Sequence, residues 1–218
     1  GLVSLTSLYA SGMPAVNAVS TNKFSMTFGT LFATFNYAKE KKIVWRIVLP
    51  SIVFALIGSS LGAQAALRYA DTFLRYMLLI VLPILTFLTL QKKEGKSSGM
   101  TQVNDYPLSF SVSSFSYLVS ALASFIIGLY DGFFGPGTGT FYTILFSFMG
   151  LPLIYSAGTT KVLNLTSNIA AFTTFLLNGT IIYIVGIPCA LASILGNTLG
   201  SRYAIKKGGK AIRKVLVV

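Results

Sequence analysis

Charged residues are scarce in this chain, and acids are the scarcest. Asp, Glu, Lys and Arg make up 10% of the 218 residues, with 5 acids against 17 bases. Between Ser109 and Ser201 the only charged residues are Asp131 and Lys161. Soluble domains carry about 25% charged residues, because a surface that faces water needs them. The composition therefore argues against a soluble domain built around one large buried core.

Histidine is absent, and Cys189 is the only cysteine. The first absence excludes Ser-His-Asp catalysis, zinc sites that use histidine and histidine proton relays. The second excludes an intramolecular disulfide and a cysteine cluster for a metal. No nucleophile-base pair, metal set or ATP-binding motif is apparent. We therefore expect no enzyme activity, no metal and no other cofactor.

Long apolar runs are abundant in this chain. Hydrophobic residues make up 54% of the sequence, and the mean hydropathy is +0.74. A bilayer crossing needs about 20 mainly apolar residues, and these runs are too continuous for barrel strands. The fold class expected is an all-α polytopic transmembrane bundle. Its runs lie at about 1–19, 24–38, 43–67, 73–91, 109–130, 133–149, 152–177, 180–201 and from 215 onward.

The net charge of +12 comes from basic clusters at the ends of these runs. Nucleic-acid binding is the usual alternative for such a charge. Here the basic residues flank apolar runs. Such residues keep loops in the cytoplasm and contact anionic lipid headgroups, and these roles explain the positive charge better than nucleic-acid binding does. We expect a lipid bilayer and no nucleic acid as partner.

The chain repeats itself. A shift of 138 positions aligns 12–75 with 150–213 without a gap. Many matches fall on Gly, Pro, Lys and Arg, which chance similarity between apolar segments would not select. The identical pairs include Gly12 and Gly150, Pro14 and Pro152, Thr21 and Thr159, Lys23 and Lys161, Pro50 and Pro188, Gly58 and Gly196, Gly62 and Gly200, and Arg75 and Arg213.

These matches define the expected domains. The first transmembrane repeat is 1–91, a polar linker covers 92–108, and the second repeat is 109–218. In this register Gly1 falls opposite Gly139, so the first repeat is expected to be incomplete at its N-terminus and the second at its C-terminus.

Loop charge indicates how the repeats are oriented. The turn at 39–42 carries three lysines, whereas the equivalent turn at 178–180 carries none. The next turn shows the opposite bias, since 202–214 is far more basic than 68–75. If basic loops stay on one side of the membrane, equivalent loops lie on opposite sides and the repeats are inverted, as in many secondary transporters. A parallel repeat whose loop charges have drifted is the alternative.

The segment 128–140, GLYDGFFGPGTGT, is the most unusual stretch. Its five glycines and Pro136 favour a helix break, which lipid tolerates only where protein or water satisfies the backbone. Amides exposed at such a break, around Gly135 and Gly137, can bind an anion. Tight turns or close helix packing are the alternative use of these glycines.

Asp131 is the only acid inside an apolar region. An intramembrane carboxylate is costly and usually pairs with a base or serves a site. Three roles are open for Asp131: it couples transport to a proton, it forms an ion pair with Lys161, or it lies at the water interface.

Two equivalent motifs are the main candidates for substrate binding, each after a G-x-P turn. We expect each motif to precede a helix, with its threonine as the cap and its lysine in the first turn, where a cation is disfavoured unless an anion binds it. In inverted repeats both lysines can meet one oxyanion. Snorkelling to headgroups is the alternative for the lysines, and interhelical hydrogen bonding is the alternative for the asparagines. The candidates are Thr21, Asn22, Lys23, Thr159, Thr160, Lys161 and Asn164, with Asn168 one turn further along.

The Gly-x-x-x-Gly pairs at 58–62 and 196–200 are interpreted as structural, with a helix packed on each.

The stretches NKFSMTFGTLFATFNYAKEKKI, GLYDGFFGPGTGTF, KVLNLTSNIAAF and GSRYAIKKGGKAIR closely resemble the sulfite exporter TauE/SafE family, most of all its bacterial YfcA-like branch. The resemblance covers nearly the whole chain, although the first repeat lacks a Gly-rich opening. It implies a multi-pass protein of the bacterial inner membrane. Some members are associated with transport of sulfite, sulfonates and related anions.

We therefore expect a secondary transporter for a small anion, with sulfur oxyanions and organosulfonates as the candidate class. Alternating access between the repeats is the expected mechanism. Because no ATP-binding motif is present, either an ion gradient, with protons and sodium as the candidate ions, or an uncoupled path supplies the driving force. A non-transporting membrane scaffold or assembly factor is the alternative function. Substrate, direction and oligomeric state do not follow from the sequence.

Overall fold

The computed structural model describes residues 2–91 and 114–208, and every regular element in these ranges is an α-helix. The expected all-α class is therefore confirmed. The expected linker at 92–108 lies outside the described residues. The helices are α1 (Leu2–Ala10), α2 (Ala15–Lys39), α3 (Trp45–Gln91), α4 (Ser114–Phe133), α5 (Thr138–Phe148), α6 (Leu153–Leu177) and α7 (Tyr183–Lys207).

Within residues 2–91 and 114–208, two helical segments are long and apolar enough to cross a membrane: Trp45–Tyr69 at the start of α3, and Tyr183–Lys207, which is α7. The outer face of α7 is strongly apolar. Ile184 is 83% exposed and Leu199 is 66% exposed. An exposed apolar face of this kind is costly in water and suits lipid contact.

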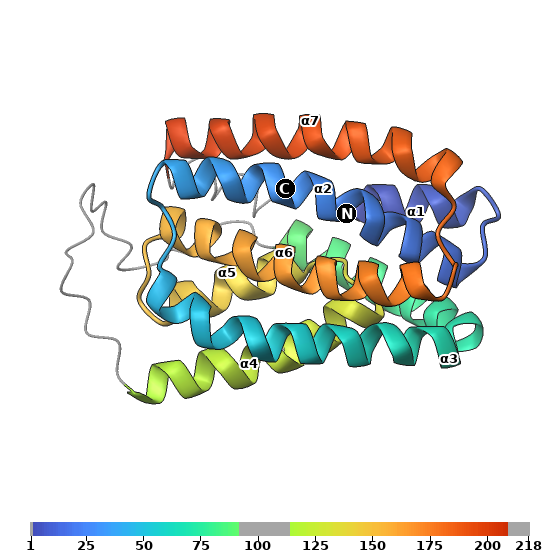
Figure 1. The fold of residues 1–218 in the computed structure, drawn as a ribbon, viewed down its shortest axis with the longest axis horizontal. Helices are drawn as coiled ribbons and strands as arrows, with labels where there is room; N and C mark the ends of the chain where they lie inside the picture. The colour runs from blue at the N-terminus through green and yellow to red at the C-terminus, as the bar shows by residue number, and fades with distance from the viewer. Residues whose placement is uncertain (1, 92–113, 209–218) are drawn as a thin grey trace.

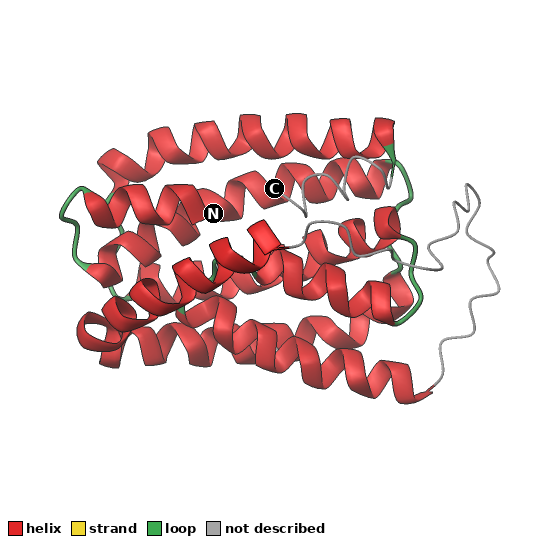
Figure 2. Ribbon diagram, turned by 180° about the vertical axis from the view of Figure 1, so that it is seen from behind, coloured by secondary structure: helices red, strands yellow, loops and turns green. Residues whose placement is uncertain are grey.

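The long helices lie side by side in layers (Figure 1). α7 packs on α2, α2 packs on α6, α6 packs on α3, and α3 packs on α4. Seen from behind, the connecting loops lie at the two ends of the bundle (Figure 2). This arrangement places α2 and α6, which carry the two lysine motifs, in the middle of the bundle.

Equivalent helices end or begin at equivalent residues. Pro14 and Pro152 are the N-cap residues of α2 and α6, with nearly identical backbone angles (φ −53°, ψ 143° and φ −56°, ψ 143°). Each follows a glycine at positive φ, Gly12 at 85° and Gly150 at 89°. The fixed φ of proline suits a helix start, and glycine permits the preceding left-handed turn. Both helices are 25 residues long.

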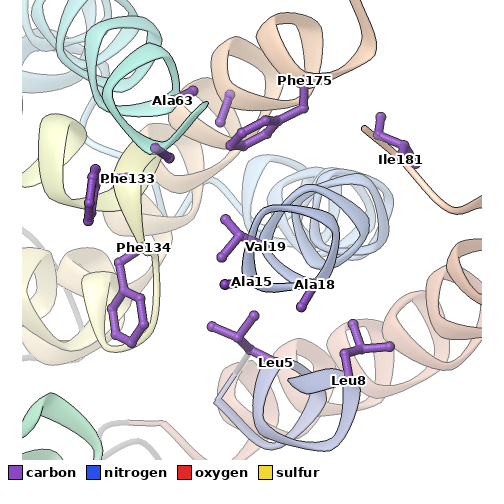
Figure 3. Close-up of a cluster of buried hydrophobic side chains, with 12 residues drawn as sticks. Leu5, Leu8, Ala15, Ala18, Val19, Ala63, Phe133, Phe134, Phe175 and Ile181 are labelled. Carbon is purple, nitrogen blue, oxygen red and sulfur yellow. The ribbon is translucent and has the colours of Figure 1, made fainter. Parts of the chain in front are cut away.

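One apolar cluster joins α1 and α2 to the ends of α4 and α6 (Figure 3). Leu5, Val19, Phe134 and Phe175 are at most 1% exposed within it. A second cluster, nearer the N-terminal half of α6, includes Tyr142, Phe146 and Leu163.

Glycines allow the backbones of α3 and α4 to touch. A Cβ at Gly58 or Gly62 would collide with the carbonyl oxygen of Phe125 or Leu129, respectively. The expectation of a packing role is therefore confirmed for Gly58 and Gly62.

In the second repeat the same expectation is wrong for the described part of the chain. No described atom lies within 4 Å of the position that a Cβ would take at Gly196 or Gly200. The reason is that α7 packs on α2 through its other face, where Gly186 contacts Phe24 and Thr21.

Candidate functional site

The two lysine motifs lie inside helices and do not precede them. α2 begins at Ala15 and α6 begins at Leu153, so Lys23 and Lys161 each lie more than two turns from the helix start. The expectation that each lysine occupies a first turn is wrong. Nothing between each proline and its motif interrupts a helix, so the helix starts directly after the proline.

Thr21 and Thr159 make the same contact in opposite directions between the repeats. The Ile182 N–H donates to Thr21 Oγ1 at 3.1 Å, and the Val44 N–H donates to Thr159 Oγ1 at 3.2 Å. Ile182 is the N-cap residue of α7, and Val44 directly precedes α3. Amides at a helix start lack a partner within their own helix. Each threonine thus binds the start of a helix in the other repeat, instead of the start of its own.

The neighbouring positions repeat this reciprocity. Ser20 Oγ donates to the Thr180 carbonyl at 2.8 Å, and Gly158, the equivalent of Ser20, packs on the Lys42 carbonyl. Lys42 and Thr180 are themselves equivalent positions. Positions 138 residues apart on α2 and α6 therefore make matched contacts.

Lys23 lies at the centre of a buried polar cluster. Its Nζ is 2.8 Å from Asp131 Oδ1 and donates to Asn168 Oδ1 at 3.0 Å. The side chains of Lys23 and Asp131 are 2% and 4% exposed. A buried charge persists only when it is paired and hydrogen-bonded. Lys23 therefore joins α2 to both α4 and α6.

Asp131 pairs with Lys23, so the suggested ion pair with Lys161 is wrong. Asp131 Oδ1 also accepts a hydrogen bond from Thr138 Oγ1 at 2.8 Å. Asp131 Oδ2 is buried and has no hydrogen-bond partner in the described structure. Both partners of the carboxylate, Lys23 and Thr138, thus contact Oδ1, and Oδ2 has no donor in the described structure.

The chain between α4 and α5 wraps around this ion pair. Helix α4 ends at Phe133, α5 begins at Thr138, and Gly135 and Gly137 have positive φ of 97° and 86°. A Cβ at Gly135 would lie 3.0 Å from Lys23 Nζ and 3.3 Å from Asp131 Oδ1. Glycine is therefore needed at 135 for its backbone angle and for the space that Lys23 occupies.

Lys161 has a different environment. Its Nζ donates to Asn197 Oδ1 of α7 at 3.1 Å. Within the described part of the chain, the one ion pair is that of Lys23 with Asp131, and Lys161 forms none. The partner of the Lys161 ammonium group is thus a neutral amide and not an acid.

Two of the remaining candidates, Thr160 and Asn164, lie at the interface of α5 and α6. Thr160 Oγ1 and Thr143 Oγ1 are 3.2 Å apart and share a hydrogen bond. Asn164 Nδ2 lies 3.1 Å from the position that a Cβ would take at Gly139. Asn22, on α2, is 3% exposed, and its Oδ1 has no hydrogen-bond partner in the described structure.

The structure thus gathers the candidates into two places. Lys23, Asp131 and Gly135 come together, whereas Lys161 binds a residue of α7. Sequence reasoning did not single out Thr138 or Asn197, which hold Asp131 and Lys161. Asn197 carried a usable signal, because an amide in an apolar span needs a polar partner. Among the described residues no group of three or more acids and cysteines is placed to hold a metal.

Comparison with known proteins gives a consistent result. The family model "Sulfite exporter TauE/SafE" matches residues 1–218. The chain is 32% identical to the "probable membrane transporter protein ORF9" of a Sinorhizobium species, covering 100% of this chain and 80% of the relative. It is 31% identical to the "probable membrane transporter protein YfcA" of Escherichia coli K12, covering 100% and 78%. No solved structure gives a significant match.

Proposed function

The chain belongs to the sulfite exporter TauE/SafE family, a family of membrane transporters, and from this premise we propose that it is a secondary carrier for a small anion. Sulfur oxyanions and organosulfonates are the substrate class that we propose. The single observation that carries the anion assignment is Lys161, a lysine of a central helix that is held by a neutral amide.

Hydroxyl and amide groups at the interface of α5 and α6 are the other donors that we propose for the substrate site. Thr160 and Thr143 share one hydrogen bond, so their hydroxyls can turn to donate to an oxyanion. Asn164 lies close to the start of α5, next to Gly139. Lys23 contributes a second ammonium group once Asp131 releases it. This set provides charge and several donors, as recognition of an oxyanion requires.

Alternating access between two inverted repeats is the mechanism that we propose. The reciprocal contacts of Thr21 with Ile182 and of Thr159 with Val44 support it, because a two-fold axis between the repeats generates paired contacts of this kind. Helix α2 belongs to one repeat and α6 to the other, and Lys23 bonds to both Asp131 and Asn168 of the second repeat. Movement of one repeat against the other would therefore change the partners of Lys23.

The proposed location is the bacterial inner membrane, which the chain crosses several times. The two membrane-length segments and the apolar outer face of α7 support this placement. Because no energy-supplying cofactor is expected, a gradient of protons or sodium ions, or of the anion itself, drives the proposed transport.

The test is a flux measurement with the purified protein in liposomes, using labelled sulfite, sulfate, thiosulfate and methanesulfonate. Lys161→Ala and Lys23→Ala are expected to abolish saturable flux of the transported anion. Lys39→Ala is the matched control, because Lys39 is an exposed lysine at the end of α2. Each variant is checked for folding by its thermal transition in detergent.

Each outcome has a definite meaning. Saturable flux that is lost in both site variants and kept in Lys39→Ala supports the carrier and its site. Flux that survives both site variants contradicts the site while leaving a carrier. Absence of flux for the whole panel, under imposed proton and sodium gradients, contradicts the proposed function and favours a scaffold or assembly factor.

A further inference from the structure

The buried ion pair leaves one polar atom unexplained. Asp131 Oδ1 lies within 2.8 Å of both Lys23 Nζ and Thr138 Oγ1, whereas Oδ2 is buried without a partner in the described structure. A buried carboxylate oxygen that lacks a hydrogen-bond donor destabilises the folded protein. A purely structural ion pair gains nothing from this arrangement. The free oxygen is therefore a candidate binding atom.

We propose that Asp131 Oδ2 is the proton-binding site that couples anion movement to a proton gradient. This inference rests on the proposed function and extends it, because it assigns the coupling ion and its atom. In the site without an anion, the Lys23 ammonium and the Asp131 carboxylate neutralise each other. When an anion binds the Lys23 ammonium, Asp131 loses its counter-charge and takes up a proton.

The exchange balances in atoms, and for a monovalent anion it also balances in charge. The proton comes from water on the side from which the anion enters, and it forms an O–H bond at Oδ2 of Asp131. Lys23 keeps all its protons throughout, and no electron moves. Without the proton, the bound anion and the Asp131 carboxylate would be two negative charges in one buried site. Because like charges in a buried site repel each other, protonation of the carboxylate is favoured. When the anion leaves, the proton leaves Oδ2 and Lys23 returns to Oδ1.

The geometry favours a proton over a metal cation. Lys23 Nζ is 2.8 Å from the same carboxylate and repels a second cation at Oδ2. Hard metal cations require several oxygen ligands. In the described ranges no cluster of three or more acidic or cysteine side chains is present to supply them. A proton needs only the one oxygen that is free.

The other ionisable groups around Asp131 are already engaged. Tyr130 of α4 donates its hydroxyl to the Pro136 carbonyl at 2.7 Å, and Tyr142 of α5 donates to the Ser124 carbonyl at 3.2 Å. From α6 the neutral Asn168 reaches Lys23, and from α2 Lys23 itself faces the carboxylate. Lys161 is directed to Asn197 of α7. Asp131 is thus the acid of this cluster that is placed to exchange a proton with the anion site.

The break between α4 and α5 makes the site responsive to movement. Thr138, the first residue of α5, holds Asp131, and Gly135 closes over both charged groups. Displacement of α5 relative to α4 would remove the Thr138 donor and expose the carboxylate. A coupling site must open in this way to exchange its proton with water on one side at a time.

The first test records proton and anion movement together. Liposomes containing the protein and an internal pH dye are given labelled sulfate or methanesulfonate, neither of which changes charge near neutral pH. Wild type is expected to acidify the lumen as the anion enters. Asp131→Asn is expected to lower the number of protons that enter with each anion by at least about tenfold. A tenfold change corresponds to 1.4 kcal/mol.

The controls separate coupling from folding. Glu40→Gln makes the same acid-to-amide change at an exposed turn and is expected to behave as wild type. Asp131→Glu keeps an ionisable carboxylate and is expected to retain proton movement if it folds. A second measurement requires no variant. Because one proton binds with each anion, the affinity of wild type for methanesulfonate or sulfate is expected to rise up to tenfold for each unit fall in pH.

The outcomes distinguish the two proposals. Anion exchange without proton movement in wild type, or an affinity independent of pH, overturns the proton site and leaves the carrier intact. Proton movement that persists in Asp131→Asn also overturns it. Failure of wild type to exchange or bind either anion contradicts the proposed function itself. If sodium and not pH drives uptake, the coupling ion is sodium and the inference is wrong.

Discussion

Two equivalent glycines are expected to respond to the same substitution with opposite sign. Gly62 of α3 and Gly200 of α7 are 138 positions apart and occupy the same place in the internal repeat. A Cβ at Gly62 would collide with the Leu129 carbonyl and approach the Phe133 amide nitrogen to 2.8 Å, whereas the same atom at Gly200 meets no described atom within 4 Å. The substitution Gly→Ala therefore tests how the two helices pack.

The magnitudes follow from two opposing effects. Alanine is favoured over glycine inside a helix by about 1 kcal/mol, and this gain applies at both positions. Overpacking costs about 1–3 kcal/mol, and the upper part of this range applies at Gly62 because backbone atoms cannot rotate away. We expect Gly62→Ala to lose about 2 kcal/mol net and Gly200→Ala to be neutral or stabilised by up to about 1 kcal/mol.

Thermal unfolding of the purified protein in detergent measures the difference. For a chain of this size, 1 kcal/mol shifts Tm by about 2–4 °C, so the two variants are expected to differ by about 5–10 °C. Gly132→Ala on α4 is the companion variant, since its Cβ would collide with the Ser59 carbonyl and should reproduce the loss at Gly62. Equal losses at Gly62 and Gly200 would refute the reasoning, because they would require a helix packed on the outer face of α7.

Three further predictions concern the buried polar groups. Thr21→Val and Thr159→Val should each destabilise the protein by about 1–3 kcal/mol and by similar amounts in thermal unfolding, because each leaves one amide at a helix start without its partner; a loss in only one would contradict their equivalence. Ser124→Ala should leave Tm unchanged or raise it, since Ser124 Oγ is buried without a partner and the Ser124 carbonyl that Tyr142 uses is retained. Asn197→Asp should place a carboxylate beside Lys161 and, in a protein that still folds, weaken anion binding at least about tenfold, or 1.4 kcal/mol. An anion affinity equal to that of wild type would contradict the place of Lys161 in the anion site.

The sequence allowed the helical class to be predicted because lipid leaves few choices to an apolar chain with so little charge. The repeat register also predicted where helices would correspond, and α2 and α6 begin at equivalent prolines. The order within the motifs was not predictable in the same way. A threonine followed by a lysine near a proline looks like a helix start, and only the three-dimensional arrangement shows that Thr21 binds the start of α7.

The partner of Asp131 was not predictable either, because pairing depends on which helices are neighbours. Lys161 is on α6 and Lys23 on α2, and both helices lie in the middle of the bundle (Figure 1). What decides the partner is the path of the chain from α4 to α5, which brings Gly135 against Lys23. Asn197 and Thr138 escaped sequence reasoning for the same reason, since their roles come from helices that meet only in the folded chain.

The proposed function gives different tasks to the two lysines, which lie 138 positions apart. At 23 the charge is balanced by Asp131 of the other repeat, whereas at 161 it is balanced by no acid in the described chain. A carrier that binds an anion needs an unbalanced positive charge, and a carrier that couples to protons needs a charge whose balance can change. In the proposed function Lys161 and Lys23 have these two tasks, and their helices α6 and α2 pack on each other. Exchange of the two environments, by combining Asn197→Asp with Asp131→Asn, would therefore be expected to move the uncompensated charge from Lys161 to Lys23 and to leave anion exchange without proton coupling.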